Sequence, residues 1–481
     1  MIALIVHLTE NTMTDISLTP QQTDAMNRIR GFLKTPGAGV FILRGYAGTG
    51  KTTLLQTLGL WLKENEKDFV MLAPTGRAAT VLRAKTGLDA KTIHSELYVF
   101  NKIDGEPDAD LTDPEADQFG QMRLMFSARA SDPDEEKIYI VDEASMISDE
   151  PGDEMSYAHF GSGHLLSDLL YAAGTNKIIF SGDPAQLPPI GSSDSPALSA
   201  TFMSRQGRSV TSFDLTDILR QKSDNEILKL ATRVRALTSL DNYPKWLKLP
   251  ARETGQVSLM SYESMKDAYF RHVATHGYAD SIAVCHSNLN CADINRSLRQ
   301  QLYGKDHAPL QVGDLLMVTQ NNHLVPLSNG DFVEVRHVGE KQYHEGLAFI
   351  SIRVKAQLSG LEHECLLCEE LLYNGHANLM PHQQRMIMIE FSRRMRRRKV
   401  KPGSDAYMTA LRTDPYLNSL RANFGYAVTC NKSQGGEWTH VFFFIHRGMY
   451  IMPRPSLARW WYTGITRAKE KLYLSSDWWI G

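Results

Sequence analysis

The sequence predicts an α/β protein with two parallel-sheet lobes, and a small β module with a helical arm inserted into the second lobe. Three observations lead to this prediction. Short apolar runs alternate with helix-like stretches in the first half, a Gly-rich turn follows the first run, and the alternation resumes later without such a turn. Buried runs that alternate with helices indicate parallel strands. The 481 residues are enough for about two to four domains.

The expected first lobe takes its sheet from four apolar runs, at residues 40–43, 69–73, 138–141 and 177–180. Helix-like stretches separate them, at residues 52–62, 77–85 and 164–173. Polar residues follow each run, and open α/β sheets bind ligands at the carboxyl ends of their strands. We therefore expect a first lobe at residues 1–213, with its functional site at that edge.

The expected second lobe resumes the pattern with apolar runs at residues 281–285, 440–445 and 471–474 and helix-like stretches at 290–302 and 457–469. Between them the rhythm changes to short antiparallel-type strands at 315–319, 332–338 and 348–354, with a turn signal at 329–331. Helix-like stretches follow at 380–400 and 405–420. We expect a second lobe at residues 214–314 and 422–481, interrupted by a β-barrel-like module with a helical arm at 315–421.

Composition excludes several protein classes. The chain is 42% hydrophobic and 22% charged with a net charge of −2, so nucleic acid would have to bind through local basic patches. Five scattered cysteines argue against a secreted disulfide framework and favour a reducing, cytoplasmic compartment. No apolar stretch approaches the ~20 residues that span a bilayer, and residues 1–6 are too short for a signal core. We expect no membrane association.

Residues 45–52, Gly-Tyr-Ala-Gly-Thr-Gly-Lys-Thr, match the P-loop pattern GxxxxGK[ST] between an expected strand and an expected helix. Glycines let backbone N–H groups face phosphates at the helix N-terminus. Lys51 would neutralise the β- and γ-phosphates, and the Thr52 hydroxyl would ligate Mg²⁺. The sequence therefore predicts an ATP and Mg²⁺ site, with nucleotide contacts from Gly45, Ala47, Gly48, Thr49, Gly50, Lys51, Thr52 and Thr53.

Asp142 and Glu143 end another apolar run. An Asp at this place can hold the Mg²⁺ shell, and the following carboxylate can orient or deprotonate the attacking water. This pair favours hydrolysis over transfer to a small acceptor. Arg220 and Arg467 lie on expected second-lobe elements and are candidate arginine fingers, although spacing alone also fits solvated surface residues.

Eight segments lie in order along the chain, one before the P-loop and seven after it, and one of them contains Asp142 and Glu143. They are residues 18–22, 73–79, 92–95, 142–145, 182–189, 215–221, 426–438 and 462–468. Taken together with the P-loop, they resemble the motifs of superfamily 1B DNA helicases of the RecD-like and phage Dda-like group. The resemblance implies two RecA-like lobes closing on one ATP, with Arg220 and Arg467 as fingers. It implies that Gln22 reads the adenine, that Gln186 senses the γ-phosphate, and that Gly436 and Glu437 lie at the nucleotide.

The resemblance also implies movement along single-stranded DNA and unwinding of a forked duplex by a monomer. The Leu-Pro-Pro sequence at 187–189 and the inserted β module favour the 5′→3′ branch of the family. The expected DNA contacts are Pro74, Thr75, Gly76, His94, Asn288, Thr429 and Ser433.

Members of this branch often carry a hairpin that splits the duplex, and residues 96–134 occupy its place. Here 97–103 and 122–126 can pair, with Tyr98 and Phe100 on one face. Phe100 is the candidate for stacking on a terminal base pair, and packing within the hairpin is the alternative for both aromatics. The acidic segment 104–117 would repel phosphate, so it either points away from DNA or docks a protein partner.

Three features stay open at this stage. The basic block 393–401 either grips a DNA backbone or is a solvated helix face. Cys365 and Cys368, with His363 nearby, suggest zinc but lack a second ligand pair, so packed thiols are the alternative. Trp460 and Trp461 are expected in the core. Two rival functions also remain: a DNA-stimulated ATPase that remodels protein–DNA complexes without unwinding, and a small-molecule or nucleoside kinase.

Overall fold

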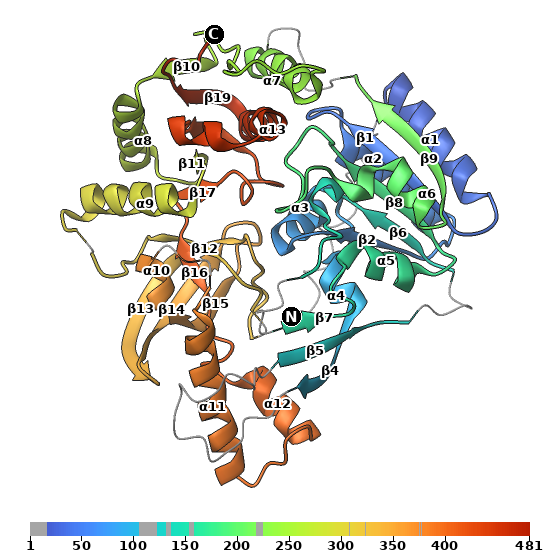
Figure 1. Cartoon of the computed structure of the whole chain (residues 1–481). Helices are drawn as coiled ribbons and strands as arrows, with labels where there is room; N and C mark the ends of the chain where they lie inside the picture. The colour runs from blue at the N-terminus through green and yellow to red at the C-terminus, as the bar shows by residue number, and fades with distance from the viewer. Residues whose placement is uncertain are drawn as a thin grey trace, which may run out of the picture.

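The computed structural model of the chain describes residues 17–104, 123–130, 136–152, 158–217, 225–306, 308–322, 324–374, 376 and 378–481. Four sheets organise these residues (Figure 1). Two are wholly parallel and carry the two lobes, one is antiparallel, and one is a small three-stranded sheet. The expected fold class of two α/β lobes with an inserted β module is confirmed.

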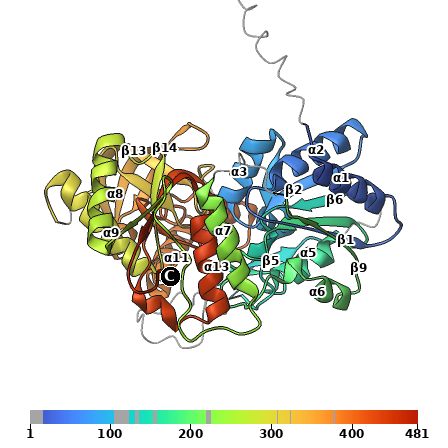
Figure 2. The same ribbon diagram turned by 90° about the horizontal axis from the view of Figure 1, so that it is seen from above.

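The first lobe has a six-stranded parallel sheet with helices on both faces (Figure 2). Along β1, Phe41 and Leu43 pack with helices α1 and α2, whereas Val40 and Ile42 pack with α5. Such two-sided burial explains why the strand reads as a continuous apolar run. The strands in sheet order are β3 (Ala90–Thr92), β2 (Phe69–Ala73), β6 (Ile138–Val141), β8 (Lys177–Gly182), β1 (Gly39–Gly45) and β9 (Ser209–Leu215). The helices are α1 (Pro20–Leu33), α2 (Lys51–Glu64), α3 (Gly76–Thr86), α4 (Ile93–Leu97), α5 (Leu165–Ala173) and α6 (Ala200–Arg205).

The second lobe has a five-stranded parallel sheet. Phe443 of its strand β18 packs on Trp460 of α13, and Phe442 packs on Tyr269 of α8, so these helices cover opposite faces. Trp460 and Trp461 are buried, as expected. The strands in sheet order are β10 (Val257–Met260), β19 (Ala468–Ser475), β18 (Trp438–Phe443), β11 (Ser281–Cys285) and β17 (Ala427–Thr429). The helices are α7 (Glu226–Ala236), α8 (Tyr262–His276), α9 (Asn288–Tyr303) and α13 (Arg454–Ile465).

The inserted module is an antiparallel sheet with a helical arm that extends away from the lobes (Figure 1). Phe391 of α11 packs against Tyr407 of α12 and holds the arm together. The strands in sheet order are β15 (Glu362–Cys368), β14 (Leu347–Ala356), β13 (Phe332–His344), β12 (Leu315–Val318) and β16 (Ala422–Phe424). The helices are α10 (Glu370–Asn374), α11 (Pro381–Arg397) and α12 (Asp405–Thr413).

Two of the expected domain limits fall in the wrong place. Strand β9 pairs with β1 as far as Leu215, so the first sheet continues past residue 213. Strand β16 pairs with β12 of the antiparallel sheet, so residues 422–424 belong to the module rather than to the second lobe. β9 is mostly polar and β16 has only three residues, so neither forms an apolar run from which a strand could be predicted.

The expected hairpin forms between β4 (Tyr98–Asp104) and β5 (Arg123–Ala128), which pair antiparallel with Phe100 opposite Phe126. A third strand, β7 (Ala158–Phe160), adds parallel to β5. The sequence pattern does not anticipate β7. The acidic segment 104–117 lies almost wholly outside the described residues. No helix in the described ranges is long and apolar enough to cross a membrane.

Candidate nucleotide site and DNA-facing surface

The P-loop joins β1 to α2 and leaves the start of that helix open. Gly48 and Gly50 have φ angles of +83° and +76°, the left-handed region that glycine adopts without strain. Gly50 is also the helix N-cap and offers no capping side chain. Lys51 Nζ lies across the loop and donates to the carbonyls of Gly45 (2.8 Å) and Tyr46 (3.1 Å). The loop therefore combines free helix N–H groups with a positive charge, the arrangement that binds phosphates.

Thr49 and Thr53 occupy the loop and the first helical turn. The Thr49 hydroxyl is almost fully buried and donates to the Tyr46 carbonyl over 2.9 Å, which shapes the loop from inside. The Thr49 N–H donates to the same carbonyl over 3.3 Å, so in this conformation both the side chain and the amide of Thr49 shape the loop. Its phosphate contact stays a prediction.

Thr52 and Asp142 lie together at the carboxyl edge of the first sheet. The Thr52 hydroxyl is 3.5 Å from Asp142 Oδ2, and Asp142 Oδ1 accepts a 2.9 Å hydrogen bond from Ser181 at the end of β8. A hydroxyl and a carboxylate are hard oxygen donors, which Mg²⁺ prefers. These two residues therefore fit the Mg²⁺-holding role that the sequence predicts.

Glu143 follows Asp142 in a left-handed backbone conformation, with φ of +51°. Burial raises the pKa of its carboxyl above the ordinary value, and the neighbouring Asp142 raises it further. The positive charges of Arg467 and Lys51 act in the opposite direction. The charges of Lys51 from the first lobe and Arg467 from the second therefore both act on the Glu143 carboxyl next to Asp142.

Gln22 lies beneath the P-loop. Its side chain is buried and donates to the carbonyls of Thr49 (3.2 Å) and Gly50 (3.4 Å), while its oxygen accepts the Thr19 N–H and caps α1. Its neighbour Gln21 accepts the N–H groups of Thr216 and Asp217, at the end of β9. In this conformation Gln22 supports the loop, and the adenine-reading role stays a prediction.

Arg467 is buried on the second lobe beside the segment 436–437. Its guanidinium donates to the carbonyls of Thr463 (2.9 Å) and Gly436 (3.2 Å). Glu437 forms an ion pair of 3.3 Å with Lys85 of the first lobe. Gly436 and Glu437 thus lie at the lobe contact, and their expected place at the nucleotide stays a prediction. Arg220, the other predicted finger, lies outside the described residues.

A buried polar cluster joins the lobes directly behind the P-loop. The fully buried Asp183 carboxylate accepts from Arg235 of α7 and, over 2.6 Å, from the Tyr462 hydroxyl of α13. The Tyr462 hydroxyl in turn accepts the backbone N–H of Ala47 over 3.1 Å. Arg235 also stacks 3.6 Å above the Tyr46 ring. The predicted nucleotide contact Ala47 therefore uses its amide across the lobe contact in this conformation.

The sequence alone predicts no role for Arg235 or Tyr462. Tyr462 belongs to the last matched motif, which is a usable signal. Arg235 lies on an ordinary amphipathic helix, and only its contact with Asp183, 52 positions away, marks it.

The segment after Asp183 continues this contact between the lobes. Leu187 N–H donates to the Thr463 hydroxyl (2.9 Å), and Gln434 donates to the Leu187 carbonyl (3.1 Å). Gln186 is buried here, and its side-chain oxygen finds no hydrogen-bond partner among the described residues. An unsatisfied buried acceptor is costly. A γ-phosphate would need the amide N–H groups of Gln186 rather than this oxygen, so the sensing role stays a prediction.

Arg77 joins three parts of the molecule. It starts on α3 of the first lobe, donates to the Gly330 carbonyl of the module (3.2 Å), and lies over the rings of Phe332 (4.5 Å) and Trp438 (5.1 Å). Burial lowers the pKa of Arg77 to about 10, so the side chain remains charged at neutral pH. Module, first lobe and second lobe thus meet on one cation.

The predicted DNA contacts on the first lobe differ in exposure. Pro74 is half-buried, and Thr75 caps α3 by accepting the Ala78 N–H over 3.2 Å. Gly76 is buried so closely against Ser328 of the module that a Cβ at position 76 would lie 1.8 Å from the Ser328 Cβ. Gly76 therefore serves a close approach between lobe and module here and offers no open surface.

His94 lies at the base of the hairpin sheet. Its ring is 5.2 Å from Phe160 and 5.5 Å from Tyr98, and burial lowers its pKa, which favours the neutral form. Tyr98 is buried and donates to Asp168 over 2.7 Å. Phe100 is half-buried, edge-on to Phe126 at 5.6 Å. Tyr98 is thus a packing residue, as the alternative proposed, and Phe100 is the one of the two nearer to solvent.

On the second lobe, Asn288 and Thr429 line a cavity of about 290 Å³ between the lobe and the module. Asn288 is exposed at the start of α9, and Thr429 is half-buried at the end of β17. Ser433, in contrast, is fully buried and donates to the Cys430 carbonyl over 2.7 Å. The structure therefore opens the first two residues to a ligand and encloses the third.

The basic block 393–401 and the Cys365–Cys368 pair both lie in the module. Arg394 is tied to Glu390 and Asp414, both at 2.7 Å, whereas the flanking positions 393 and 396–399 are exposed at the end of α11. Cys365 and Cys368 lie on β15, and burial raises their pKa values to about 12 and about 11. Within the described residues no three-ligand group includes either thiol. The packed-thiol alternative therefore describes them.

Comparison with known families gives two matches. Residues 17–238 match the AAA domain family, and residues 424–475 match the UvrD-like helicase C-terminal domain family. The first match contains the P-loop, Asp142 and Asp183, and the second contains Ser433, Gly436 and Arg467.

Two curated relatives are similar in sequence. An uncharacterized protein of Methanocaldococcus jannaschii is 33% identical over 156 residues, which cover 32% of this chain and 12% of that protein. The ATP-dependent RecD2 DNA helicase of Deinococcus radiodurans is 22% identical over 457 residues, which cover 95% of this chain. The chain spans 48% of the length of the latter.

Two solved structures share the fold. A chain from a structure of two coordinating Pif1 helicases at forked double-stranded DNA has a TM-score of 0.51, at 16% identity, covering 96% of this chain and 92% of that chain. The Pif1 helicase from Bacteroides, bound to ADP-AlF3 and single-stranded DNA, has a TM-score of 0.50 at the same identity, covering 96% and 93%. The likeness extends through both lobes and the module.

Proposed function

We propose that this chain, a superfamily 1B helicase, is an ATP-dependent DNA helicase that moves 5′→3′ on single-stranded DNA and couples Mg-ATP hydrolysis to unwinding. One observation carries the proposal. Lys51 and the Asp142–Glu143 pair belong to one lobe, Arg467 belongs to the other and its charge acts on Glu143, and hydrogen bonds join the two lobes at the P-loop. Hydrolysis at such a site changes the interactions that hold the lobes together, and relative motion of two lobes is what a translocase requires.

The residues divide the chemistry between them. Lys51 and the α2 N-terminus bind the phosphates, and Thr52 with Asp142 would hold Mg²⁺. When bound, Mg²⁺ neutralises charge that develops on the β- and γ-phosphates. Glu143, whose raised pKa brings it nearer to neutral pH, accepts the proton of the attacking water. Arg467 turns from the Gly436 carbonyl to the γ-phosphate and stabilises the transition state, a role worth about 10³–10⁵ in rate.

The contact between the lobes couples this chemistry to movement. Ala47 of the P-loop shares the Tyr462 hydroxyl with Asp183, so phosphates that recruit the Ala47 amide weaken one bond between the lobes. Gln186 lies three residues after Asp183, and in this proposal its side-chain N–H groups donate to the γ-phosphate. Loss of the γ-phosphate then restores the original bonds. Each cycle thereby alternates two arrangements of the lobes.

The DNA path crosses both lobes in this proposal. Pro74, Thr75 and His94 contribute from the first lobe, and Asn288 and Thr429 from the second, beside the cavity of about 290 Å³. Gly76 and Ser433 reach the strand only after the lobes and module rearrange, because both are buried in this conformation. The Bacteroides Pif1 structure with single-stranded DNA supports the choice of ligand.

Three further assignments belong to this proposal. The chain works as a monomer, because the proposed site takes all its residues from one chain. The segment 104–117 docks a protein partner, since its acidic residues repel phosphate. The first lobe ends at residue 215. The second lobe runs from there to residue 314 and resumes after the module at residue 425.

The test is ATP turnover with and without single-stranded DNA, together with displacement of one strand from forked duplexes that carry either a 5′ or a 3′ tail. We expect DNA to stimulate turnover and displacement to require the 5′ tail. Lys51→Ala should lose both activities. Turnover without displacement would instead support the remodelling ATPase, and turnover indifferent to DNA would contradict the proposal.

A further inference from the structure

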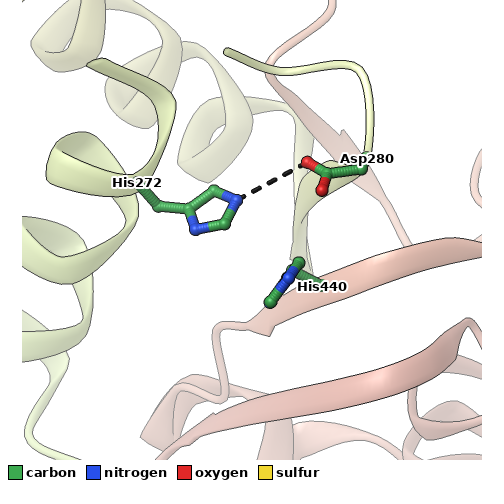
Figure 3. Close-up of side chains that lie close together, drawn as sticks. All are labelled: His272, Asp280 and His440. Atoms are coloured by element: carbon green, nitrogen blue, oxygen red, sulfur yellow. Dashed lines mark ion pairs between the residues drawn. The ribbon is translucent and has the colours of Figure 1, made fainter. Parts of the chain in front are cut away.

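Three metal-ligating side chains converge on the outer face of the second lobe, at a place that the proposed motor does not use. They are His272 of α8, Asp280 before β11, and His440 of β18 (Figure 3). One ligand atom from each lies within 4.8 Å of the other two. We refer to these three residues as the His272 cluster.

The backbone fixes two members of the cluster side by side. β11 and β18 pair in parallel with Ser281 opposite His440, and the His440 N–H donates to the Asp280 carbonyl over 3.0 Å. His272 approaches from the last turns of α8, which ends at Gly277 with φ of +78°. The three side chains thus come from elements whose relative position the sheet and helix packing already determine.

The polar atoms of the cluster face one another without satisfying one another. His272 Nε2, Asp280 Oδ1 and His440 Nδ1 are buried, and none has a hydrogen-bond partner within the described part of the chain. His272 Nε2 and Asp280 Oδ1 form an ion-pair contact of 3.6 Å (Figure 3), which is too long for a hydrogen bond. Buried polar atoms are rarely left unpaired, and three of them aimed at one point indicate a common partner.

We propose that the His272 cluster binds a divalent transition-metal ion of the zinc type. Two imidazole nitrogens and a carboxylate oxygen form a donor set that zinc uses at about 2.0–2.2 Å. In a tetrahedral site those bond lengths place neighbouring ligand atoms about 3.3 Å apart, close to the 3.6 Å between His272 and Asp280. The ligand atom of His440 lies within 4.8 Å of the other two, so binding of the ion would draw it closer. The fourth position is open to water or to His276, whose ring is 4.8 Å from that of His272.

The ion would act on structure rather than on ATP. His440 shares its side of β18 with Phe442, which contacts His272 and Tyr269 of α8. The opposite side of the sheet carries α13 and the contact with the first lobe. A metal ion at the cluster therefore pins α8 to β18 and β11, and it does so on the face turned away from the nucleotide.

Zinc titration of the whole chain tests the proposal. The protein is stripped with a chelator, dialysed, and titrated with Zn²⁺ against a chromogenic zinc chelator, and a parallel titration with Co²⁺ follows the visible absorption of the bound ion. We expect one equivalent of tightly bound Zn²⁺, a Co²⁺ spectrum of nitrogen and oxygen ligation, and a higher Tm with zinc. His440→Ala and Asp280→Asn should each weaken binding by at least about 10–100-fold.

His382→Ala is the matched control, because His382 is an exposed histidine at the start of α11. It should bind zinc as the unaltered chain does. Circular dichroism in the absence of metal separates loss of the site from loss of the fold, and Asp280→Asn keeps the shape of the side chain. The proposal is overturned if the unaltered chain binds no zinc, or if His440→Ala and Asp280→Asn keep the same stoichiometry and affinity.

Discussion

The Tyr462 hydroxyl makes two hydrogen bonds to the other lobe, so removing this one group tests how strongly the lobes are held together. It donates to the fully buried Asp183 carboxylate over 2.6 Å and accepts the Ala47 amide over 3.1 Å. It also accepts from the Arg235 guanidinium over 3.3 Å, a contact within the second lobe. Tyr462→Phe keeps the ring and deletes all three hydrogen bonds, including the two that join the lobes.

We expect this change to cost about 2–4 kcal/mol of the free energy that keeps the lobes in contact. A hydrogen bond to an ionised carboxylate contributes about 1.5–3 kcal/mol, and an ordinary one about 1 kcal/mol. Asp183 keeps its bonds from Arg235 and from the Ala185 amide. The cost therefore stays near or below the ~3–5 kcal/mol of breaking a buried ion pair.

Hydrogen exchange of the peptide 45–50, followed by mass spectrometry, reports the loss directly. Because 1.4 kcal/mol is a factor of ten, exchange limited by separation of the lobes should accelerate about 30- to 1,000-fold. Tyr171→Phe is the control, since Tyr171 is 64% exposed. If Tyr462→Phe exchanges within threefold of the unaltered chain, the hydroxyl does not hold the lobes and the reasoning fails.

Four further outcomes are expected. Lys51→Ala should lower ATP turnover at least about 100-fold and leave DNA binding intact by fluorescence anisotropy, whereas Lys63→Ala, exposed on the same helix, should change neither. Glu143→Gln should bind ATP and lose turnover. In the unaltered chain kcat should rise with pH because the base acts deprotonated, with a midpoint above the ordinary pKa of a glutamate; a midpoint at or below that ordinary value would contradict this. Phe100→Ala should reduce unwinding of forked duplexes and spare DNA-stimulated turnover, with Val99→Ala, 48% exposed, as the unaffected partner; equal unwinding by both would rule out stacking by Phe100. Gly464→Ala should lower the free energy of unfolding, measured by urea denaturation, by about 1–3 kcal/mol, because its Cβ would clash with the buried Phe443 ring. Gly31→Ala, with open space around it, should not lower that free energy.

Much of the fold could be predicted because the strands of the two parallel sheets are buried on both faces. The runs at 40–43 and 138–141 are apolar throughout and became β1 and β6. Edge strands lack this signal. β9 has only exposed and half-buried positions until Leu215, and β15 mixes charged residues with thiols, so neither shows a continuous apolar run. Strands of this kind are defined by their neighbours, which a single sequence does not display.

The site divides along the same line. Lys51, Thr52 and the Asp142–Glu143 pair are predictable because loop chemistry needs particular residues at fixed spacing. Arg235 is not, because its role arises from a partner brought close by folding. A motif also does not show whether its residues are buried. The family resemblance implied that Gly76 and Ser433 contact DNA, and the structure encloses both.

The position of Arg77 has an energetic consequence for any hinge in this molecule. A guanidinium enclosed by two aromatic rings and a carbonyl has surrendered most of its hydration, and the lowered pKa records that loss. Separating the three bodies returns the cation to water, and bringing them together strips it again. Any hinge motion that parts these three bodies therefore exchanges the contacts of Arg77 for water, so the two arrangements differ in the hydration of this one cation.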